Sequence, residues 1–120
     1  MAHRLARMSP DARAWYLAEI AFIAERNPVA AEKIAARFRA ARQNLADHPK
    51  IGPTGLIPGT RRLVVGPYVL TVRQHGGIVE IAAIRHAKQS DAYAPKEMSQ
   101  DLAAEDSPID PPTDTSMKAR

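Results

Sequence analysis

The hydrophobic positions in the first part of the chain recur at helical spacing. Ser9, Pro10 and Asp11 form a helix-start signal, because serine caps free amides, proline fits the first turn and an acid suits the positive helix end. We therefore predict a helix over about residues 10–26. Its expected inward stripe is Ala12, Tyr16, Ile20, Ile23 and Ala24, with Leu17 beside it and Trp15 and Phe22 on a flank.

A second helix follows almost without a linker. Asn27 and Pro28 form another start signal, and apolar residues then repeat at three- and four-residue steps to about Asp47. These apolar residues are Ala30, Ala31, Ile34, Phe38, Ala41 and Leu45. Because so little chain separates the two helices, they must turn back on each other as an antiparallel hairpin.

The pattern changes to strands after a loop rich in proline and glycine over residues 49–59. Alternating β-branched and aromatic residues predict three strands, over residues 62–65, 68–74 and 78–85, with turns at Gly66-Pro67 and Gly76-Gly77. A further short edge strand is expected within residues 3–8. The predicted fold is therefore α+β, with an N-terminal two-helix hairpin packed on a small antiparallel β-sheet.

Alternation also predicts which strand residues share a face. In the last strand we expect Ile78, Glu80, Ala82 and Ile84 on one face and Val79, Ile81, Ala83 and Arg85 on the other. Arg73 of the middle strand is expected to stand together with Arg85 on the outer face, if the register allows.

Composition divides the chain at residue 90. Residues 91–120 contain four prolines and seven acidic against three basic side chains, whereas residues 1–90 hold fourteen basic against six acidic ones. We expect residues 1–90 to form one domain and 91–120 to be an acidic, mostly disordered tail, with a helical turn or two around Met98 and Leu102. A basic body favours a polyanion or an acidic protein segment as partner, unless its surface is merely solvated.

Length and composition exclude several function classes. A chain of 120 residues is too short for a doubly wound nucleotide fold with a second domain. It has no cysteine, which excludes disulfides, thiolate metal sites and a cysteine nucleophile and suits a reducing cytoplasm. Its most apolar N-terminal stretch, residues 14–24, is too short to span a bilayer. We therefore expect a cytoplasmic protein with no membrane association.

The candidate chemistry is basic. The four histidines are scattered without metal-ligand spacing, so we expect neither a metal site nor a cofactor. Arginines bind phosphates through two-point contacts. If the chain cleaves RNA, the catalytic candidates are His86, Lys88, Arg85, Arg73 and Arg61, although His86 is as readily explained as a structural residue at a strand end.

Other residues are candidates for partner contacts. Arg61, Arg62 and Arg73 could pair with carboxylates of a partner. Trp15 and Phe22 are either packed against the fold or used as binding anchors, since tryptophan is enriched at interface hot spots. Arg37, Arg39 and Arg42 of the second helix form either its solvated face or a contact with an acidic partner.

The order and spacing of several short sequence segments resemble those of the RelE/ParE toxin superfamily of type II toxin–antitoxin (plasmid stabilisation) systems, and its ParE branch most closely. These segments are, in chain order, Ser9-Pro10, residues 22–24 followed by Asn27-Pro28 and Ala30-Ala31, Leu45 with Pro49 and Gly52, residues 58–65, residues 68–70, and Glu80-Ile81 with Ile84 and His86. The resemblance covers about residues 3–90.

The resemblance implies a helix hairpin on a small sheet and a partner antitoxin whose flexible segment wraps the toxin in a hetero-oligomer. ParE-type members poison DNA gyrase, whereas RelE-type members cut mRNA on the ribosome with arginine, lysine and a C-terminal tyrosine or histidine. This chain departs from the family pattern at Glu19, at Val72 and after His86, where Ala87, Lys88 and Gln89 stand.

These observations lead to three hypotheses. The first is a non-enzymatic toxin that inhibits gyrase and is neutralised by a cognate antitoxin. The second is a ribosome-dependent mRNA endoribonuclease. The third is an inactive or regulatory antitoxin-binding module.

Overall fold

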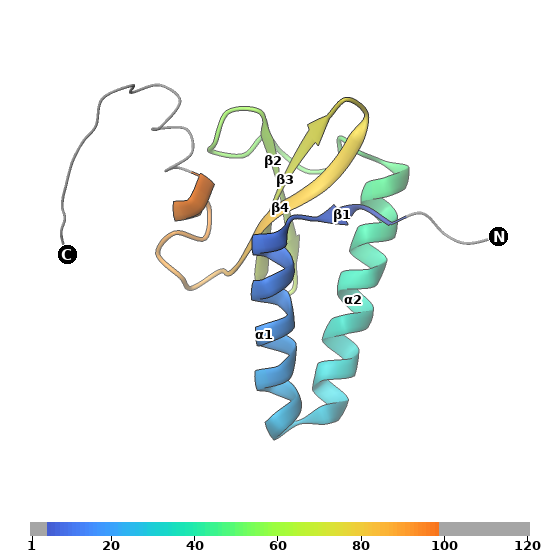
Figure 1. The fold of residues 1–120 in the computed structure, drawn as a ribbon, viewed down its shortest axis with the longest axis vertical. Coiled ribbons are helices and arrows are strands. Elements are labelled where there is room, and N and C mark those ends of the chain that lie inside the picture. The colour runs from blue at the N-terminus through green and yellow to red at the C-terminus, as the bar shows by residue number, and fades with distance from the viewer. Residues whose placement is uncertain (1–4, 99–120) are drawn as a thin grey trace.

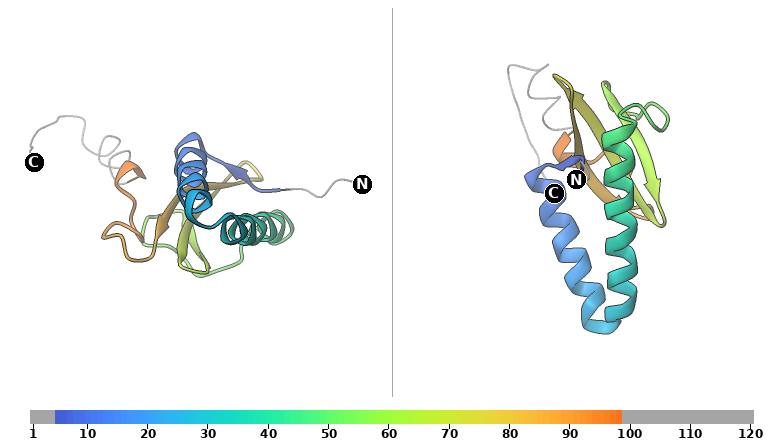
Figure 2. Two further views of the ribbon diagram at one scale, coloured as in Figure 1. Left: turned by 90° about the horizontal axis from the view of Figure 1, so that it is seen from below. Right: turned by 90° about the vertical axis from the view of Figure 1, so that its right-hand side faces the viewer.

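A helix hairpin covers one face of a four-stranded sheet (Figures 1 and 2). The computed structural model describes residues 5–98 of the chain. Its elements, in chain order, are β1 (Arg7–Met8), α1 (Pro10–Arg26), α2 (Pro28–Asp47), β2 (Thr60–Val65), β3 (Tyr68–His75) and β4 (Ile78–His86). The tip of the hairpin projects beyond the sheet, so only part of each helix contacts the strands (Figure 1).

Both helices begin at the predicted caps. The Ser9 side chain accepts a hydrogen bond from the Ala12 amide at 3.0 Å, and the Asn27 side chain accepts one from the Ala30 amide at 3.0 Å. The Asn27 amide also donates to the carbonyl of Ile23 at 2.7 Å. One residue therefore ends α1 and starts α2, which fixes the tight hairpin.

The strand order in the sheet is β1-β4-β3-β2. Strands β2, β3 and β4 form an antiparallel meander, whose turns carry the expected glycines with positive φ at Gly66, Gly76 and Gly77. The edge strand β1 instead pairs in parallel with β4. The predicted α+β fold is confirmed, and the sheet is mixed because β1, which the whole helix hairpin separates from the antiparallel meander, pairs in parallel with β4.

A β-bulge in β4 changes which of its residues face the helices. Thr71 pairs with Ala83 but Val72 pairs with Ile81, so Ala82 is an extra residue in β4. Strict alternation over β4 was therefore a wrong prediction. The core residues of β4 are Val79, Ile81 and Ile84, all packed with the helices, while Ala82 and Ala83 pack on the opposite face.

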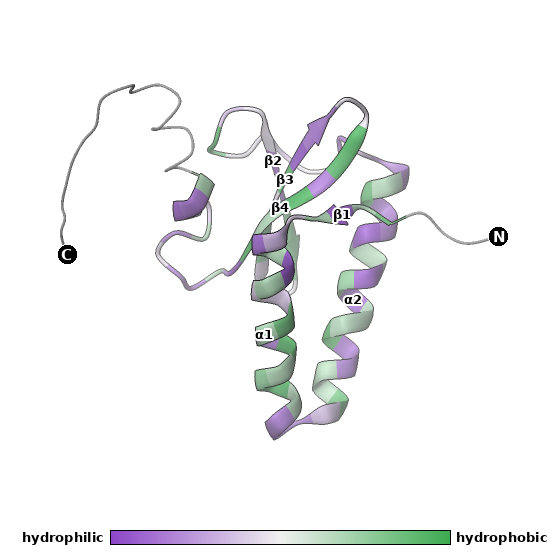
Figure 3. Ribbon diagram, viewed as in Figure 1, coloured by the Kyte–Doolittle hydropathy of each residue, from purple (hydrophilic) through white to green (hydrophobic). Residues whose placement is uncertain are grey.

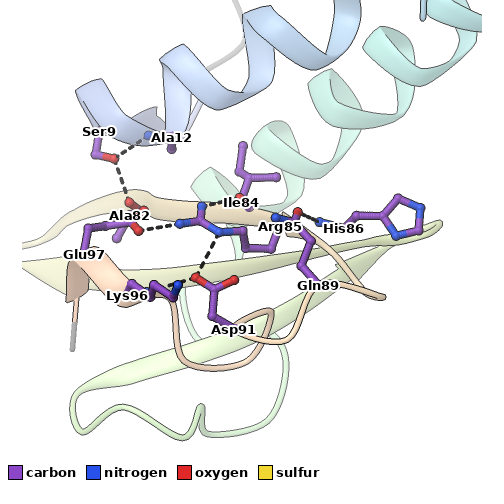
Figure 4. A network of polar contacts seen from close by, with 10 residues as sticks. All are labelled: Ser9, Ala12, Ala82, Ile84, Arg85, His86, Gln89, Asp91, Lys96 and Glu97. Atoms are coloured by element: carbon purple, nitrogen blue, oxygen red, sulfur yellow. Dashed lines mark hydrogen bonds and ion pairs between the residues drawn. The ribbon is translucent and has the colours of Figure 1, made fainter. Parts of the chain in front are cut away.

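Ser9 holds this bulge in place. Its hydroxyl donates to the carbonyl of Ala82 at 2.7 Å, and its amide donates to the carbonyl of Ile81 at 2.9 Å. The same hydroxyl caps α1, so a single side chain links the start of the helix to the irregular point of the sheet (Figure 4).

The core lies between the hairpin and the sheet. Its largest fully buried side chains include Phe38, Leu45, Leu70, Ile81 and Ile84. Figure 3 shows hydrophobic residues along most of α1, whereas α2 alternates between hydrophobic and hydrophilic positions. Trp15 packs against the core, which confirms the packed alternative for this residue, whereas Leu17, expected beside the inward stripe, is 50% exposed.

The chain beyond β4 returns to the sheet. Ala92, Pro95 and Met98 are buried, and Lys96, Glu97 and Met98 are helical. The helical turn expected around Met98 therefore includes these three residues, while Leu102 and the rest of the expected tail lie outside the described residues. We call residues 91–98 the strap. They pack against the face of the sheet that is opposite the helices, which we call the outer face.

Candidate functional site

Arg85 lies near the end of β4 and is held on the outer face between two carboxylates (Figure 4). Its guanidinium donates to Asp91 at 3.3 Å and to Glu97 at 2.5 Å, and a further N–H donates to the carbonyl of Ile84 at 2.8 Å. Only 13% of the side chain is exposed. Arg85 was a candidate for binding phosphate, but its guanidinium is already paired with Asp91 and Glu97 of the same chain.

The charge of Asp91 is stabilised at this position. Burial by itself raises the pKa of Asp91, but the hydrogen bond from the Lys96 amide, at 3.1 Å, and the guanidinium of Arg85 together lower it by more. The net effect is a pKa below the ordinary value for aspartate. Asp91 and Arg85 therefore form an ion pair at neutral pH.

Arg62 is the second basic residue that contacts the strap. Its guanidinium lies 5.3 Å from the centre of the Tyr93 ring, within the range of a cation–π interaction. Beside it, Met98 packs in an apolar cluster with Ile57, Ala82 and Ala83. In the sequence, these contacts are signalled by an acidic and apolar segment that directly follows a basic strand. The composition of residues 91–120 predicted disorder, so this signal was not used.

Arg73 shares the outer face with Arg85 but lies far from it. Arg73 pairs with Glu80 and Arg85 pairs with Val69, so four register positions separate the two arginines, or about 13 Å along the strand. The guanidinium of Arg73 donates to Glu80 at 2.9 Å, and its side chain is 36% exposed. The prediction that the two arginines stand together was wrong, although both face outward.

Arg61 lies on the opposite side of the sheet. It pairs with Val72, whose side chain is in the core between sheet and helices. Its guanidinium donates to the carbonyl of Gly52 at 2.9 Å. Arg61 therefore secures the loop before β2.

His86 is the last residue of β4 and also lies on the helix side of the sheet. It pairs with Tyr68, and the two rings are 5.7 Å apart in an edge-on arrangement. The backbone amide of Lys88 donates to His86 Nδ1 at 3.2 Å. In Figure 4 the imidazole points away from the Arg85 guanidinium. The structure therefore does not bring His86, Lys88, Arg85, Arg73 and Arg61 together.

Glu19, which departs from the family pattern, has a clear partner. Its carboxylate accepts a hydrogen bond from the Tyr68 hydroxyl at 2.8 Å. Burial, the hydrogen bond and the charge of Glu19 all raise the pKa of Tyr68, so the phenol stays protonated. Trp15 packs edge-on against the same tyrosine ring at 5.9 Å. Sequence reasoning did not identify this pair, because 49 residues separate its members.

Phe22 is placed differently from Trp15. Its side chain is 54% exposed on α1, and the guanidinium of Arg26 lies 4.0 Å from its ring centre. Of the two aromatic residues considered as binding anchors, only Phe22 offers a large open surface.

The described part of the chain carries neither a metal-binding cluster nor a membrane-spanning helix. Within residues 5–98 no group of three or more histidine, cysteine, aspartate or glutamate side chains is arranged to hold a metal ion. None of the described helices is long and apolar enough to cross a membrane.

Comparison with known proteins gives three consistent results. The model of the family described as ParE toxin of type II toxin–antitoxin system, parDE, matches residues 6–91. Toxin RelE2 of Caulobacter vibrioides is 35% identical over 66 residues, which cover 55% of this chain and 75% of that toxin. A solved structure described as a chromosomal ParDE TA system from P. aeruginosa superposes with a TM-score of 0.59, covering 71% of this chain and 98% of that one. At 20% identity, the latter similarity concerns the fold.

Proposed function

Because this chain belongs to the ParE toxin family of type II toxin–antitoxin systems, we propose that it arrests growth by inhibiting DNA gyrase, without catalysing a reaction itself. In this proposal it acts in the cytoplasm, where gyrase and its DNA are found. A cognate antitoxin neutralises it in a hetero-oligomer.

The observation that favours gyrase over mRNA is the dispersal of the candidate catalytic residues. Cleavage at an RNA phosphate needs a base for the 2′-hydroxyl, an acid for the leaving oxygen and cations on the phosphate, all at one point. Here Arg61 and His86 lie on the helix side of the sheet, and Arg73 and Arg85 on the outer face. Arg85 is also occupied by Asp91 and Glu97.

The antitoxin contact is proposed to use exposed groups. Phe22 is an apolar anchor on α1, and Arg73 is a partly exposed cation close to the β3–β4 turn. An antitoxin that contacts Arg62 would also contact Tyr93, because the Arg62 guanidinium lies over the Tyr93 ring. In this proposal Arg61 and Trp15 contribute indirectly. Arg61 fixes the loop before β2 through its hydrogen bond to Gly52, and Trp15 packs against Tyr68.

A pair of assays on the same purified toxin tests the proposal. We expect the protein to inhibit DNA supercoiling by gyrase and to leave mRNA on translating ribosomes intact. His86→Ala should leave gyrase inhibition within about threefold of the wild type, as should His75→Ala, a matched exposed histidine near the β3–β4 turn.

Two outcomes would contradict this assignment. Codon-dependent mRNA cuts that are abolished by His86→Ala but not by His75→Ala, with gyrase unaffected, would establish the endoribonuclease. Binding of the antitoxin without growth arrest, gyrase inhibition or mRNA cleavage would establish an inactive or regulatory module.

A further inference from the structure

The first helix has an apolar face that the fold leaves open. Ala14, Leu17, Ala18 and Ala21 recur at steps of three and four residues, so they lie on one side of α1. All four are exposed to solvent, and the hydrophobic colouring of α1 in Figure 3 includes them. We call these four residues the α1 stripe.

The α1 stripe faces away from the rest of the fold. Tyr16 packs against Phe38 and marks the side of α1 that meets the second helix. At 3.6 residues per turn, Ala14 and Ala18 lie about 160° around the helix from Tyr16. Among the described elements, no helix or strand covers this side of α1 (Figures 1 and 2). A helix that is apolar on its solvent side as well as on its core side is typical of one that packs on both sides.

The charged residues around the stripe balance one another. Asp11 and Arg13 lie near the start of α1, and Glu25 and Arg26 lie near its end. All four are exposed, and none of them forms an ion pair within residues 5–98. Two acids and two bases leave this side of α1 neutral, whereas the chain as a whole is basic. A neutral, apolar surface does not suit a polyanion.

The sizes of the stripe residues suit pairing with an identical helix. In an antiparallel pair with two-fold symmetry, Leu17 of one copy can lie against Ala21 of the other, and the symmetry repeats this contact. A large side chain against a small one lets two helices approach to about 8 Å. The stripe is therefore complementary in shape to a second copy of itself.

The same register brings opposite charges together. Arg13 of one copy is then level with Glu25 of the other, and Asp11 is within one residue of Arg26. In a parallel pair each of these charges would instead meet its own equivalent, like against like. The antiparallel arrangement also opposes the two helix dipoles. The order of charges along α1 therefore favours a second copy in antiparallel orientation.

We propose that the α1 stripe binds a second copy of this chain, through an antiparallel pair of α1 helices with two-fold symmetry. The surface is separate from the sheet residues Arg61, Arg62 and Arg73, and the inference does not depend on the target of the toxin. A helix face about 25 Å long and 10 Å wide is small against the roughly 800 Å² that each partner buries in a standard stable interface. The dimer therefore forms reversibly, at micromolar concentrations.

Sedimentation equilibrium of the purified full chain, from about 5 to 500 µM, tests the proposal by measuring a monomer–dimer equilibrium of this weak class. Leu17→Glu should weaken dimerisation at least tenfold, because it places two carboxylates in the apolar centre of the contact. The matched control is Val29→Glu, the same kind of change at a 61% exposed position of α2. It should alter dimerisation less than threefold, and thermal unfolding of each variant should confirm that it folds.

A charge exchange tests the orientation of the two helices. Arg13→Glu alone should weaken dimerisation, because it sets two acids level with each other. Adding Glu25→Arg in the same chain restores opposite charges at both ends and should return the affinity to within about threefold of the wild type. Both changes suit the helix dipole, so the fold should tolerate them.

Several results would overturn the inference. A chain that stays monomeric over the whole concentration range forms no such dimer. A dimer that Leu17→Glu leaves intact, or that Val29→Glu weakens as much, uses another surface. A double variant no tighter than Arg13→Glu alone would contradict the antiparallel register. These measurements involve neither gyrase nor an antitoxin, so their failure would leave the proposed function untouched.

Discussion

The two faces of the sheet are covered by different means. The helix hairpin covers one face with large apolar side chains such as Phe38 and Leu45. The strap covers the outer face with ion pairs to Arg85, a cation–π contact to Arg62 and a small apolar cluster. Apolar burial is non-directional and insensitive to pH, whereas ion pairs depend on geometry and on protonation. The two faces should therefore respond differently to mutation, truncation and pH.

The largest effect is expected from Ser9→Ala, which removes the hydroxyl that links the start of α1 to the bulge in β4. The buried Ser9 hydroxyl caps α1 and satisfies the carbonyl of Ala82 at the bulge. Removing it leaves a buried carbonyl and a helix amide without partners, which should cost about 2 to 3 kcal/mol of unfolding free energy. Urea unfolding measures this, with Ser90→Ala at an exposed position as the control. A loss below about 1 kcal/mol would mean that the bulge does not depend on the hydroxyl.

A smaller effect is expected when the outer face loses its cover. Truncation after Ser90 removes the partners of Arg85 and the buried side chains of Ala92, Pro95 and Met98. We expect the melting temperature to fall by about 5 to 10 °C, or roughly 1 to 2 kcal/mol for a domain of this size. Truncation after Met98 keeps all these contacts and should change it by less than about 2 °C. Equal melting temperatures for both truncated chains would mean that the strap does not stabilise the fold.

The smallest effect is expected from Asp91→Asn, and it should depend on pH. The folded state lowers the pKa of Asp91, so its charge stabilises the fold above the unfolded pKa of about 3.9. That stabilisation is lost as the pH falls through the lower folded value. The variant should be less stable than the wild type by under about 1 kcal/mol at pH 7, and the difference should shrink as the pH drops below about 4. A constant difference down to pH 3 would contradict an ionic role for Asp91.

Local signals predicted the helices and strands because their causes are local. Ser9 and Asn27 satisfy amides within their own first turns, and Gly76 and Gly77 adopt the positive φ that a tight turn requires. The helical periodicity likewise identified Ala12 and Phe38 as core residues. These features need only a few neighbouring residues to be determined.

The candidate site was less predictable, because it depends on register. One extra residue at Ala82 exchanges the faces of β4, and it places Ile84 in the core and Ala83 outside. Nothing in the alternation of small and apolar residues from Ile81 to Ile84 marks the bulge, so the relative positions of the arginines could not be derived from spacing.

The sequence by itself determined the order of helices and strands, the hairpin, the basic body and the family, since each rests on spacing or composition along the chain. Only the tertiary structure decided how the charged residues are used. Asp91 and Glu97 meet Arg85, Glu19 meets Tyr68 across 49 residues, and Arg13 of α1 lies near enough to Arg42 of α2 to lower its pKa. The physical reason is that a charged side chain finds its partner through space, so its role depends on which segments the fold brings within a few ångströms.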